Sequence, residues 1–223
     1  MGTLFIVATP IGNLKDITLR ALETIKDVDY ILCEDTRVTG KLLNNYLIAK
    51  RMVAFNEFNE NLKSEEILAD LSGDKTIALM SDAGTPLVSD PGYKLVREAI
   101  ARGIKVESIP GASAVITALA VSGMAPDRFL YLGYLPKKDG KRNSLLTEVK
   151  NLKDSFKTTV IFYESPFRVL ETLKNISDVF GDIDVVVTRE LTKLHEEVRR
   201  EKVSAAIEHF TKTPPKGEFT ILI

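Results

Sequence analysis

The chain has 223 residues, and a hydrophobic content of 44% with 27% charged residues is typical of a soluble globular protein of one large or two small domains. Its 30 Lys and Arg balance 31 Asp and Glu, which argues against a nonspecific nucleic-acid coat while leaving room for a local basic face. One cysteine and two histidines allow neither an intrachain disulfide nor a Cys/His metal cluster, and the lack of a signal peptide or membrane-length apolar run predicts a cytoplasmic protein without a metal.

The first half of the chain alternates apolar strand patterns with amphipathic helix patterns. Strands are predicted over residues 4–7, 30–33, 52–55, 76–80 and 106–109. Helices are predicted between them, with buried stripes such as Leu19, Leu22 and Ile25. Continuous apolar strands are typical of a sheet covered on both faces, so the five alternations predict a mostly parallel α/β sheet.

The stretch Ser122-Gly123-Met124-Ala125-Pro126 breaks this alternation. It is the predicted boundary between an N-terminal domain, residues 1–121, and a C-terminal domain, residues 122–223. In the second half, strands are predicted over residues 129–132, 159–163, 185–187 and 219–223, with helices between them. The alternation is less regular there, so part of the second sheet is expected to be antiparallel.

Familiar site motifs are missing from the chain. No G-x-G-x-x-G follows the first strand, Gly140-Lys141 lacks the rest of a phosphate-binding loop, and there is no G-x-S-x-G. Polar, glycine-rich segments instead follow predicted strands, at residues 9–13, 34–37, 81–86, 111–114, 162–168, 189–193 and 216–218. Sites in α/β proteins form at the carboxyl ends of strands, and glycines let a ligand approach the backbone closely. The carboxylates there suit a cationic or hydroxyl-rich ligand better than a triphosphate.

At these segments the chain closely resembles the bacterial small-subunit (16S) ribosomal RNA cytidine-2′-O-methyltransferase I family, within the tetrapyrrole methylase superfamily. The matching pieces are residues 7–14, 34–37, 81–92, 110–113, 162–168 and 189–193. The resemblance implies two α/β domains of the class III methyltransferase type, with S-adenosylmethionine in the cleft between them. It also implies methylation of the ribose 2′-hydroxyl of a cytidine in the decoding region of 16S rRNA, in the small ribosomal subunit, by a homodimer.

Two departures from the family are visible. Position 167 is Phe where the family usually has His, so an imidazole there cannot be essential to this chain's chemistry. The sequence given ends at its last predicted strand, whereas longer members of the family carry a further C-terminal segment.

Carried over by position, the resemblance implies that cofactor contacts come from both domains. The implied residues are Ile11, Asp82, Gly84, Thr85, Val88, Ser113, Ala114, Tyr163, Leu191 and Gly217. Simpler interpretations stay open for some of them. Ile11 and Val88 could be ordinary core residues, and Asp82 could stabilise its own loop as an Asx turn.

The implied reaction is an in-line attack of a ribose oxygen on a sulfonium methyl group. Alignment of the two reactants supplies most of the catalysis, and a general base would add about 10²–10⁴-fold. The catalytic candidates are Glu34, Asp35 and Glu164, each after a predicted strand, with Arg37 and Arg168 fixing these carboxylates or holding phosphates. The alternative for residues 34–37 is a structural ion pair.

Four cations within residues 137–142 are the predicted RNA contacts. Lys137, Lys138, Lys141 and Arg142 would bind phosphate together with Arg168, and Phe167 or Tyr134 would stack on a base. A second cluster comprises Arg199, Arg200 and Lys202, although most charge runs are simply solvated surface. Two rival functions stay open: a methyltransferase of small tetrapyrrole-like molecules, and a non-catalytic ribosome factor that binds RNA and cofactor.

Overall fold

The computed structural model describes residues 2–223, apart from the side chain of residue 154. Contacts divide the chain into two compact units, Met1–Ser113 and Ala114–Ile223. The division falls before helix α5 (Ala114–Ser122), whereas the sequence places it after this helix, because α5 packs on strands of the second sheet. Within the described residues, no helix is long and apolar enough to cross a membrane.

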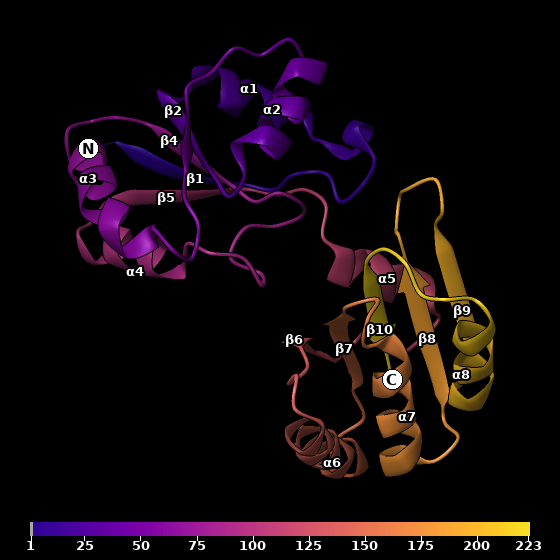
Figure 1. Cartoon of the computed structure of the whole chain (residues 1–223). Coiled ribbons are helices and arrows are strands. Elements are labelled where there is room, and N and C mark those ends of the chain that lie inside the picture. The colour runs from indigo at the N-terminus through magenta and orange to yellow at the C-terminus, as the bar shows by residue number, and fades with distance from the viewer. Residues whose placement is uncertain (1) are drawn as a thin grey trace. The chain divides into compact units, whose positions relative to one another are not determined.

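The first unit is built on a five-stranded parallel sheet in the order β3-β2-β4-β1-β5 (Figure 1). Its strands are β1 (Thr3–Val7), β2 (Tyr30–Cys33), β3 (Met52–Ala54), β4 (Ile77–Met80) and β5 (Lys105–Ile109). Its helical segments are η1 (Leu14–Asp16), α1 (Leu19–Asp27), α2 (Thr36–Asn45), α3 (Glu60–Ser72) and α4 (Tyr93–Ala101). The predicted parallel sheet and its five strands are confirmed.

Both faces of this sheet are covered, because successive side chains of a strand point to opposite faces. Leu4 and Ile6 of β1 pack in one apolar cluster with α3 and α4. Val7 of the same strand packs in the other cluster, with α1 and α2. Helices therefore occupy both faces of the sheet. A site can form in the loops that follow the carboxyl ends of β1, β2 and β4.

The second unit has a mixed five-stranded sheet in the order β6-β7-β10-β8-β9. Its strands are β6 (Phe129–Tyr134), β7 (Thr159–Glu164), β8 (Asp184–Arg189), β9 (Glu197–Lys202) and β10 (Phe219–Leu222). Helices α6 (Asp139–Ser155), α7 (Val169–Phe180) and α8 (Val203–Lys212) share one core cluster with these strands. Only β6 and β7 pair in parallel, which confirms the expectation of partly antiparallel pairing.

The edge strand β9 was not predicted from the sequence, because its residues EVRREK lack an apolar alternation. Charged side chains on an edge strand discourage pairing with other chains. Here they pair locally: Arg199 binds Glu197 and Glu201 at 3.2 and 2.6 Å, and Lys202 binds Asp184 at 3.0 Å. Arg200 donates hydrogen bonds to backbone carbonyls at the end of α5. The proposed second basic cluster is therefore already engaged within the unit.

Candidate active site

Two loops at the carboxyl edge of the first sheet are joined into one structure. The backbones of Thr9, after β1, and Gly84, after β4, exchange hydrogen bonds of 2.8 and 3.1 Å. The Thr9 hydroxyl also donates to the Ser81 carbonyl at 3.1 Å. Because β1 and β4 are neighbouring strands, these bonds fix the two loops against each other.

The loop between β4 and α4 contains four residues with a left-handed backbone conformation. Leu87 and Ser89 have φ values of 75° and 68°, and Gly84 and Gly92 have 86° and 118°. A left-handed residue other than glycine costs about 1–2 kcal/mol. Such strain persists where the surroundings impose it, commonly in loops that bind ligands. The loop thus carries local backbone strain.

The first-unit residues predicted to bind cofactor lie on these adjoining loops. A Cβ added at Gly84 would lie 3.5 Å from Ile11 Cγ2, and the Thr85 hydroxyl donates to the Ala112 carbonyl at 3.2 Å. The Val88 amide donates to the Thr85 carbonyl at 3.3 Å. Ser113 and Ala114 follow directly, at the boundary of the two units. Ile11 is buried, which fits its interpretation as a packing residue.

Asp82 connects the β4 loop to the β2 loop. Its Oδ1 accepts a hydrogen bond from the Asp35 amide at 3.1 Å, so the carboxylate stabilises a neighbouring loop and not only its own. Burial raises the pKa of Asp82, and the hydrogen bond from Asp35 opposes that effect. The structure thus brings Asp82 and Asp35 together.

Asp35 and Arg37 form an ion pair at the start of α2. Asp35 accepts from the Arg37 amide at 2.8 Å and from its guanidinium at 2.5 Å. These bonds lower the pKa of Asp35 to about 2. The interpretation of this pair as a structural ion pair therefore fits the geometry, and so acidic a carboxylate is a poor proton acceptor.

Glu34 differs from its neighbour. Its carboxylate is half-buried and, among residues 2–223 as described, has no hydrogen-bond or ion-pair partner. Burial is the largest cause of its raised pKa, and repulsion from Asp82, Glu57 and Asp35 raises the pKa further. A carboxylate with a raised pKa and free oxygens is suited to accept a proton near neutral pH.

Asp90 is a residue to which the sequence analysis gave no role. Burial, with repulsion from Glu34 and Asp82, raises its pKa from 3.8 to about 6. The signal was present in the sequence as a second aspartate in the same short loop as Asp82. Four carboxylates thus gather at this edge of the sheet, and three of them have raised pKa values.

We expect Asp90→Asn to make the protein more stable at pH 7. A pKa raised on folding means that the folded state binds the proton more tightly, so the free energy of unfolding falls as pH rises from about 4 to 6. After allowance for solvent screening, removal of this charge should add about 1 kcal/mol at pH 7. Denaturant unfolding at several pH values checks this, with exposed Asp127→Asn as the control. Equal pH slopes in both variants would contradict it.

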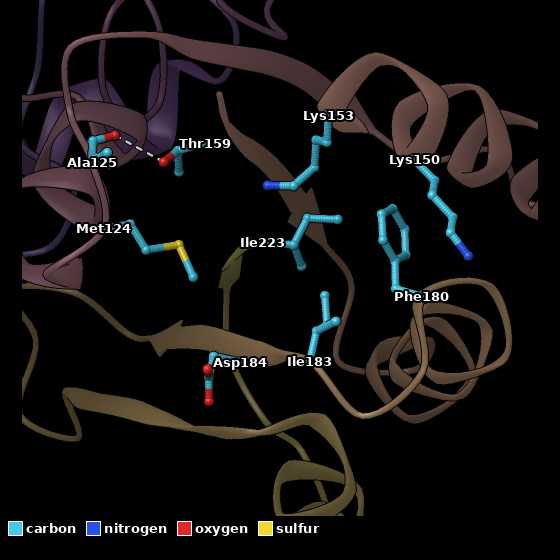
Figure 2. A pocket seen from close by; sticks show the side chains of 9 residues that line it. All are labelled: Met124, Ala125, Lys150, Lys153, Thr159, Phe180, Ile183, Asp184 and Ile223. Carbon is cyan, nitrogen blue, oxygen red and sulfur yellow. Dashed lines mark hydrogen bonds between the residues drawn. The ribbon is translucent and has the colours of Figure 1, made fainter. Parts of the chain in front are cut away.

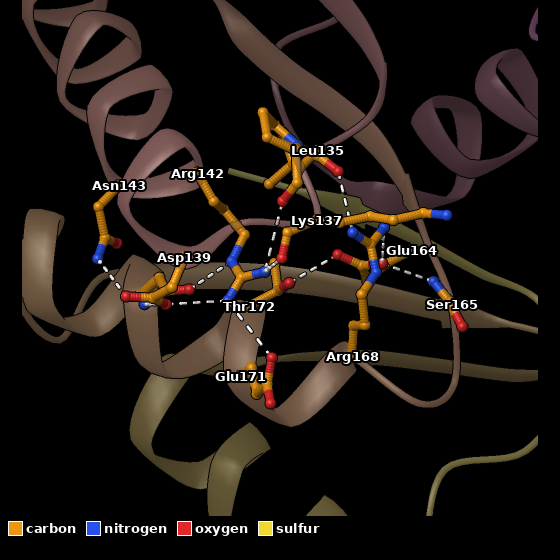
Figure 3. A network of polar contacts seen from close by, with 12 residues as sticks. Leu135, Lys137, Asp139, Arg142, Asn143, Glu164, Ser165, Arg168, Glu171 and Thr172 are labelled. Carbon is orange, nitrogen blue, oxygen red and sulfur yellow. Dashed lines mark hydrogen bonds and ion pairs between the residues drawn. The ribbon is translucent and has the colours of Figure 1, made fainter.

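In the second unit, the buried Glu164 forms an ion pair with the half-buried Arg168 (Figure 3). Arg168 Nη2 lies 2.6 Å from Glu164 Oε1, which also accepts from the Ser165 amide at 2.7 Å. The Thr172 hydroxyl donates to Oε2 at 2.6 Å. Arg168 also donates to the Leu135 carbonyl at 3.0 Å. Both carboxylate oxygens are engaged, so this geometry favours a structural role for Glu164.

Arg142 corrects one prediction. Its side chain is only 1% exposed, so it cannot contact RNA phosphate as expected from the sequence. Arg142 lies four residues before Leu146 and seven before Val149, both buried, and this spacing on a helix face could have shown that it points inward. Lys137, Lys138 and Lys141 are exposed as expected. Residues 136–141 are called the basic turn below.

The second-unit residues predicted to bind cofactor share one end of its sheet. Tyr163 is paired in register with Thr220, near the start of β10, and its ring lies 5.1 Å from that of Tyr131. Leu191 is buried just after β8. Gly217, just before β10, has a φ of 87°, and a Cβ there would lie 2.4 Å from Glu190.

A cavity of about 470 Å³ in the second unit lies elsewhere (Figure 2). It is lined at the start of β7 by Thr159, at the start of β8 by Asp184 and just after β10 by Ile223. These positions are at the opposite end of the sheet from Tyr163 and Gly217. None of the predicted site residues lines this cavity.

Comparison with known proteins identifies the class to which this fold and these loops belong. The profile of the Tetrapyrrole (Corrin/Porphyrin) Methylases matches residues 3–207. Solved structures agree in fold: a diphthine synthase superposes with a TM-score of 0.76 at 16% identity, covering 100% of this chain and 90% of that one. A cobalt precorrin-4 methyltransferase gives 0.70 at 18% identity, covering 99% of this chain and 94% of that one. The chain is a tetrapyrrole methylase by family.

Closer relatives narrow the family. The chain is 49% identical to the ribosomal RNA small subunit methyltransferase I of Thermotoga maritima, over 100% of this chain and 98% of the relative. It is 45% identical to the enzyme of the same name from Halalkalibacterium halodurans, over 100% of this chain and 75% of that longer relative. This chain belongs to the ribosomal RNA small subunit methyltransferase I family, which confirms the resemblance noted from the sequence.

Proposed function

We propose that the protein is an S-adenosylmethionine-dependent methyltransferase that methylates the ribose 2′-hydroxyl of a cytidine in the decoding region of 16S rRNA. The observation that carries this proposal is the 49% identity to a ribosomal RNA small subunit methyltransferase over the whole chain. The proposal includes a cytoplasmic homodimer acting on rRNA of the small ribosomal subunit, as the family resemblance implies.

The loops of the first unit fit the cofactor. Gly84 carries no Cβ at the point where the β1 and β4 loops meet, and its left-handed backbone lets these two loops join closely beside Asp82. Asp82 offers a half-buried carboxylate that suits hydroxyl or ammonium groups. Thr85 and Val88 continue the same loop, and Tyr163, Leu191 and Gly217 are the proposed contacts from the second unit. When bound, S-adenosylmethionine supplies an electrophilic methyl group on a sulfonium.

Glu34 is the proposed proton acceptor. The ribose hydroxyl must lose its proton as its oxygen attacks, and a base with free oxygens and a raised pKa is matched to this task. Of the three carboxylates predicted from the sequence, Asp35 is bound to Arg37 and Glu164 has both oxygens engaged. Glu34 alone among these three combines burial, a raised pKa and free oxygens.

The basic turn supports an RNA substrate. Its three lysines are exposed. Tyr134, two residues before the turn, is 56% exposed, and Phe167 is 93% exposed and precedes Arg168, which donates to the Leu135 carbonyl beside the turn. Cationic side chains beside exposed aromatic rings are typical of surfaces that bind single-stranded RNA, because the rings stack on bases. This combination favours RNA over a small tetrapyrrole-like substrate.

A methyl-transfer assay tests the function. The protein is incubated with S-adenosylmethionine labelled in the methyl group and, in separate reactions, with 16S rRNA (naked or in isolated small subunits) or with a tetrapyrrole. Label at a single ribose would support the proposal. Label only in a tetrapyrrole would favour the small-molecule enzyme, and cofactor binding without label in either substrate would favour the non-catalytic factor.

We expect Asp82→Ala to weaken cofactor binding by about tenfold or more, since loss of a charged hydrogen-bonding partner costs about 1.5–3 kcal/mol. Isothermal titration with S-adenosylmethionine measures it. The exposed residue Asp127 provides the matched Asp→Ala control. An unchanged dissociation constant would remove Asp82 from the site.

A further inference from the structure

We infer that Arg142 is a positioning residue for RNA. Its buried guanidinium holds the basic turn and pairs with the Asp139 carboxylate, so that the lysines of the turn form a preorganised cationic surface. This inference rests on the proposed function, because it concerns how the same enzyme contacts its RNA.

The contacts of Arg142 reach the start and the middle of the basic turn (Figure 3). Its Nη1 lies 3.5 and 3.4 Å from the carbonyl oxygens of Pro136 and Lys137. Its Nε donates to Asn175 Oδ1 of α7 at 2.5 Å, and its Nη2 donates to Asp139 Oδ1 at 3.0 Å. Nη2 also lies 3.5 Å from Glu171 Oε2, so one guanidinium ties the start of the turn, the start of α6 and two residues of α7 together.

The pairing of Asp139 matters because its charge opposes that of the lysines beside it. The side chain is 67% exposed, yet both of its oxygens are engaged. Oδ1 accepts from Arg142 and from Asn175 Nδ2, each at 3.0 Å, and Oδ2 accepts from Asn143 Nδ2 at 3.3 Å. Arg142 thereby compensates the one negative charge in the turn. The turn therefore repels phosphate less than it would if Asp139 were unpaired.

A second guanidinium fixes the residue just before the turn. Arg168, held by Glu164, donates to the Leu135 carbonyl at 3.0 Å. The backbone entering the turn is therefore anchored at Leu135 by Arg168 and at the next two residues by Arg142. A surface ordered before binding loses less conformational entropy when RNA binds, and this is the advantage that we assign to the network.

The test compares Arg142→Met and Arg142→Lys with the wild type. We expect both variants to raise KM for rRNA, Arg142→Met by about tenfold, while kcat and cofactor affinity stay within about twofold. If the three lysines lose their phosphate contacts, the slope of log K against log salt should weaken by about 2. The lysine variant keeps the charge but cannot serve the same partners, because its ammonium is not a planar fork.

Arg200→Met is the matched control. Arg200 also donates to backbone carbonyls of the second unit, but from β9, at the opposite edge of the sheet from β6. The Arg200→Met substitution removes one positive charge, as Arg142→Met does. It should leave KM for rRNA and the salt slope near their wild-type values. Wild-type values in both Arg142 variants would overturn the inference.

Arg142→Met removes a buried charge and can fail to fold. In that case Arg142→Lys is combined with Asp139→Asn. Removing the acid should change RNA affinity less than twofold in the wild type but strengthen binding in the Arg142→Lys protein, where no guanidinium holds the carboxylate in place. The same effect in both backgrounds would overturn the inference. A wild-type protein without RNA binding or methylation would instead refute the proposed function.

Discussion

Glu34→Gln should lower the rate of methyl transfer by about 10²–10⁴-fold at saturating cofactor and RNA, the usual contribution of a general base. Glutamine keeps the size of the side chain but cannot take up the proton of the ribose hydroxyl. Glu34 is half-buried, and its pKa is raised by burial and by the acids around it. Single-turnover kinetics with labelled S-adenosylmethionine measure the loss, and cofactor titration shows whether binding is preserved.

The pH dependence gives a second, independent readout. A base must be ionised to act, so the wild-type rate should rise with pH through the raised pKa of Glu34, and the Gln variant should lack this rise. Glu57→Gln is the matched control, because Glu57 is exposed and contributes to the repulsion at Glu34. It should shift the rise to lower pH at nearly unchanged maximal rate. If Glu34→Gln retained both the rate and the pH profile, another group would be the base.

Folding stability separates loss of chemistry from loss of structure. An ionised Glu34 is destabilised by burial and by Asp82, so Glu34→Gln should leave the free energy of unfolding at pH 7 unchanged or higher. Glu164→Gln should do the opposite, since it weakens a buried pair with Arg168. A variant that is inactive yet fully stable would therefore identify Glu34 as the catalytic member of the predicted carboxylates.

The sequence predicted the sheets well because their strands are nearly continuous apolar runs. It missed β9, whose charged residues neutralise one another across and along the sheet edge instead of packing in a core. It also grouped Arg142 with the lysines of the basic turn. The sign of a side chain's charge does not show whether that side chain points into the core or toward solvent. Only the helical spacing to Leu146 and Val149 distinguishes the buried cation from the exposed ones.

The candidate site was predictable to the level of its loops but not of its roles. Glu34 and Asp35 are adjacent acids after one strand, and nothing local ranks them as bases. Their difference arises from tertiary contacts: Arg37 binds Asp35, while burial beside Asp82 raises the pKa of Glu34. Asp90 became relevant for the same reason, since its raised pKa depends on burial near Glu34 and Asp82.

Gly217→Ala should destabilise the second unit by about 2–4 kcal/mol and abolish tight cofactor binding, through a left-handed backbone and a steric overlap together. A Cβ at this φ of 87° would lie 2.4 Å from Glu190 Cδ and Oε1. Glu190 cannot easily move away, because its Oε1 accepts from Lys193 Nζ at 2.9 Å and from the Glu218 amide at 3.0 Å. Thermal unfolding and titration with S-adenosylmethionine measure the two effects.

Gly123→Ala separates the cost of a left-handed backbone at alanine from the cost of the steric overlap with Glu190. Gly123 belongs to the same unit and has a φ of 77°, but a Cβ there would meet nothing within 4 Å, so only the left-handed cost of about 1–2 kcal/mol should remain. Adding Glu190→Ala to Gly217→Ala should recover part of the loss, because the overlapping carboxyl is gone. Equal destabilisation by Gly217→Ala and Gly123→Ala would show that the Glu190 side chain moves away from the added methyl group. The loop around Gly217 would then lack the tight packing that we expect cofactor binding at this end of the sheet to require.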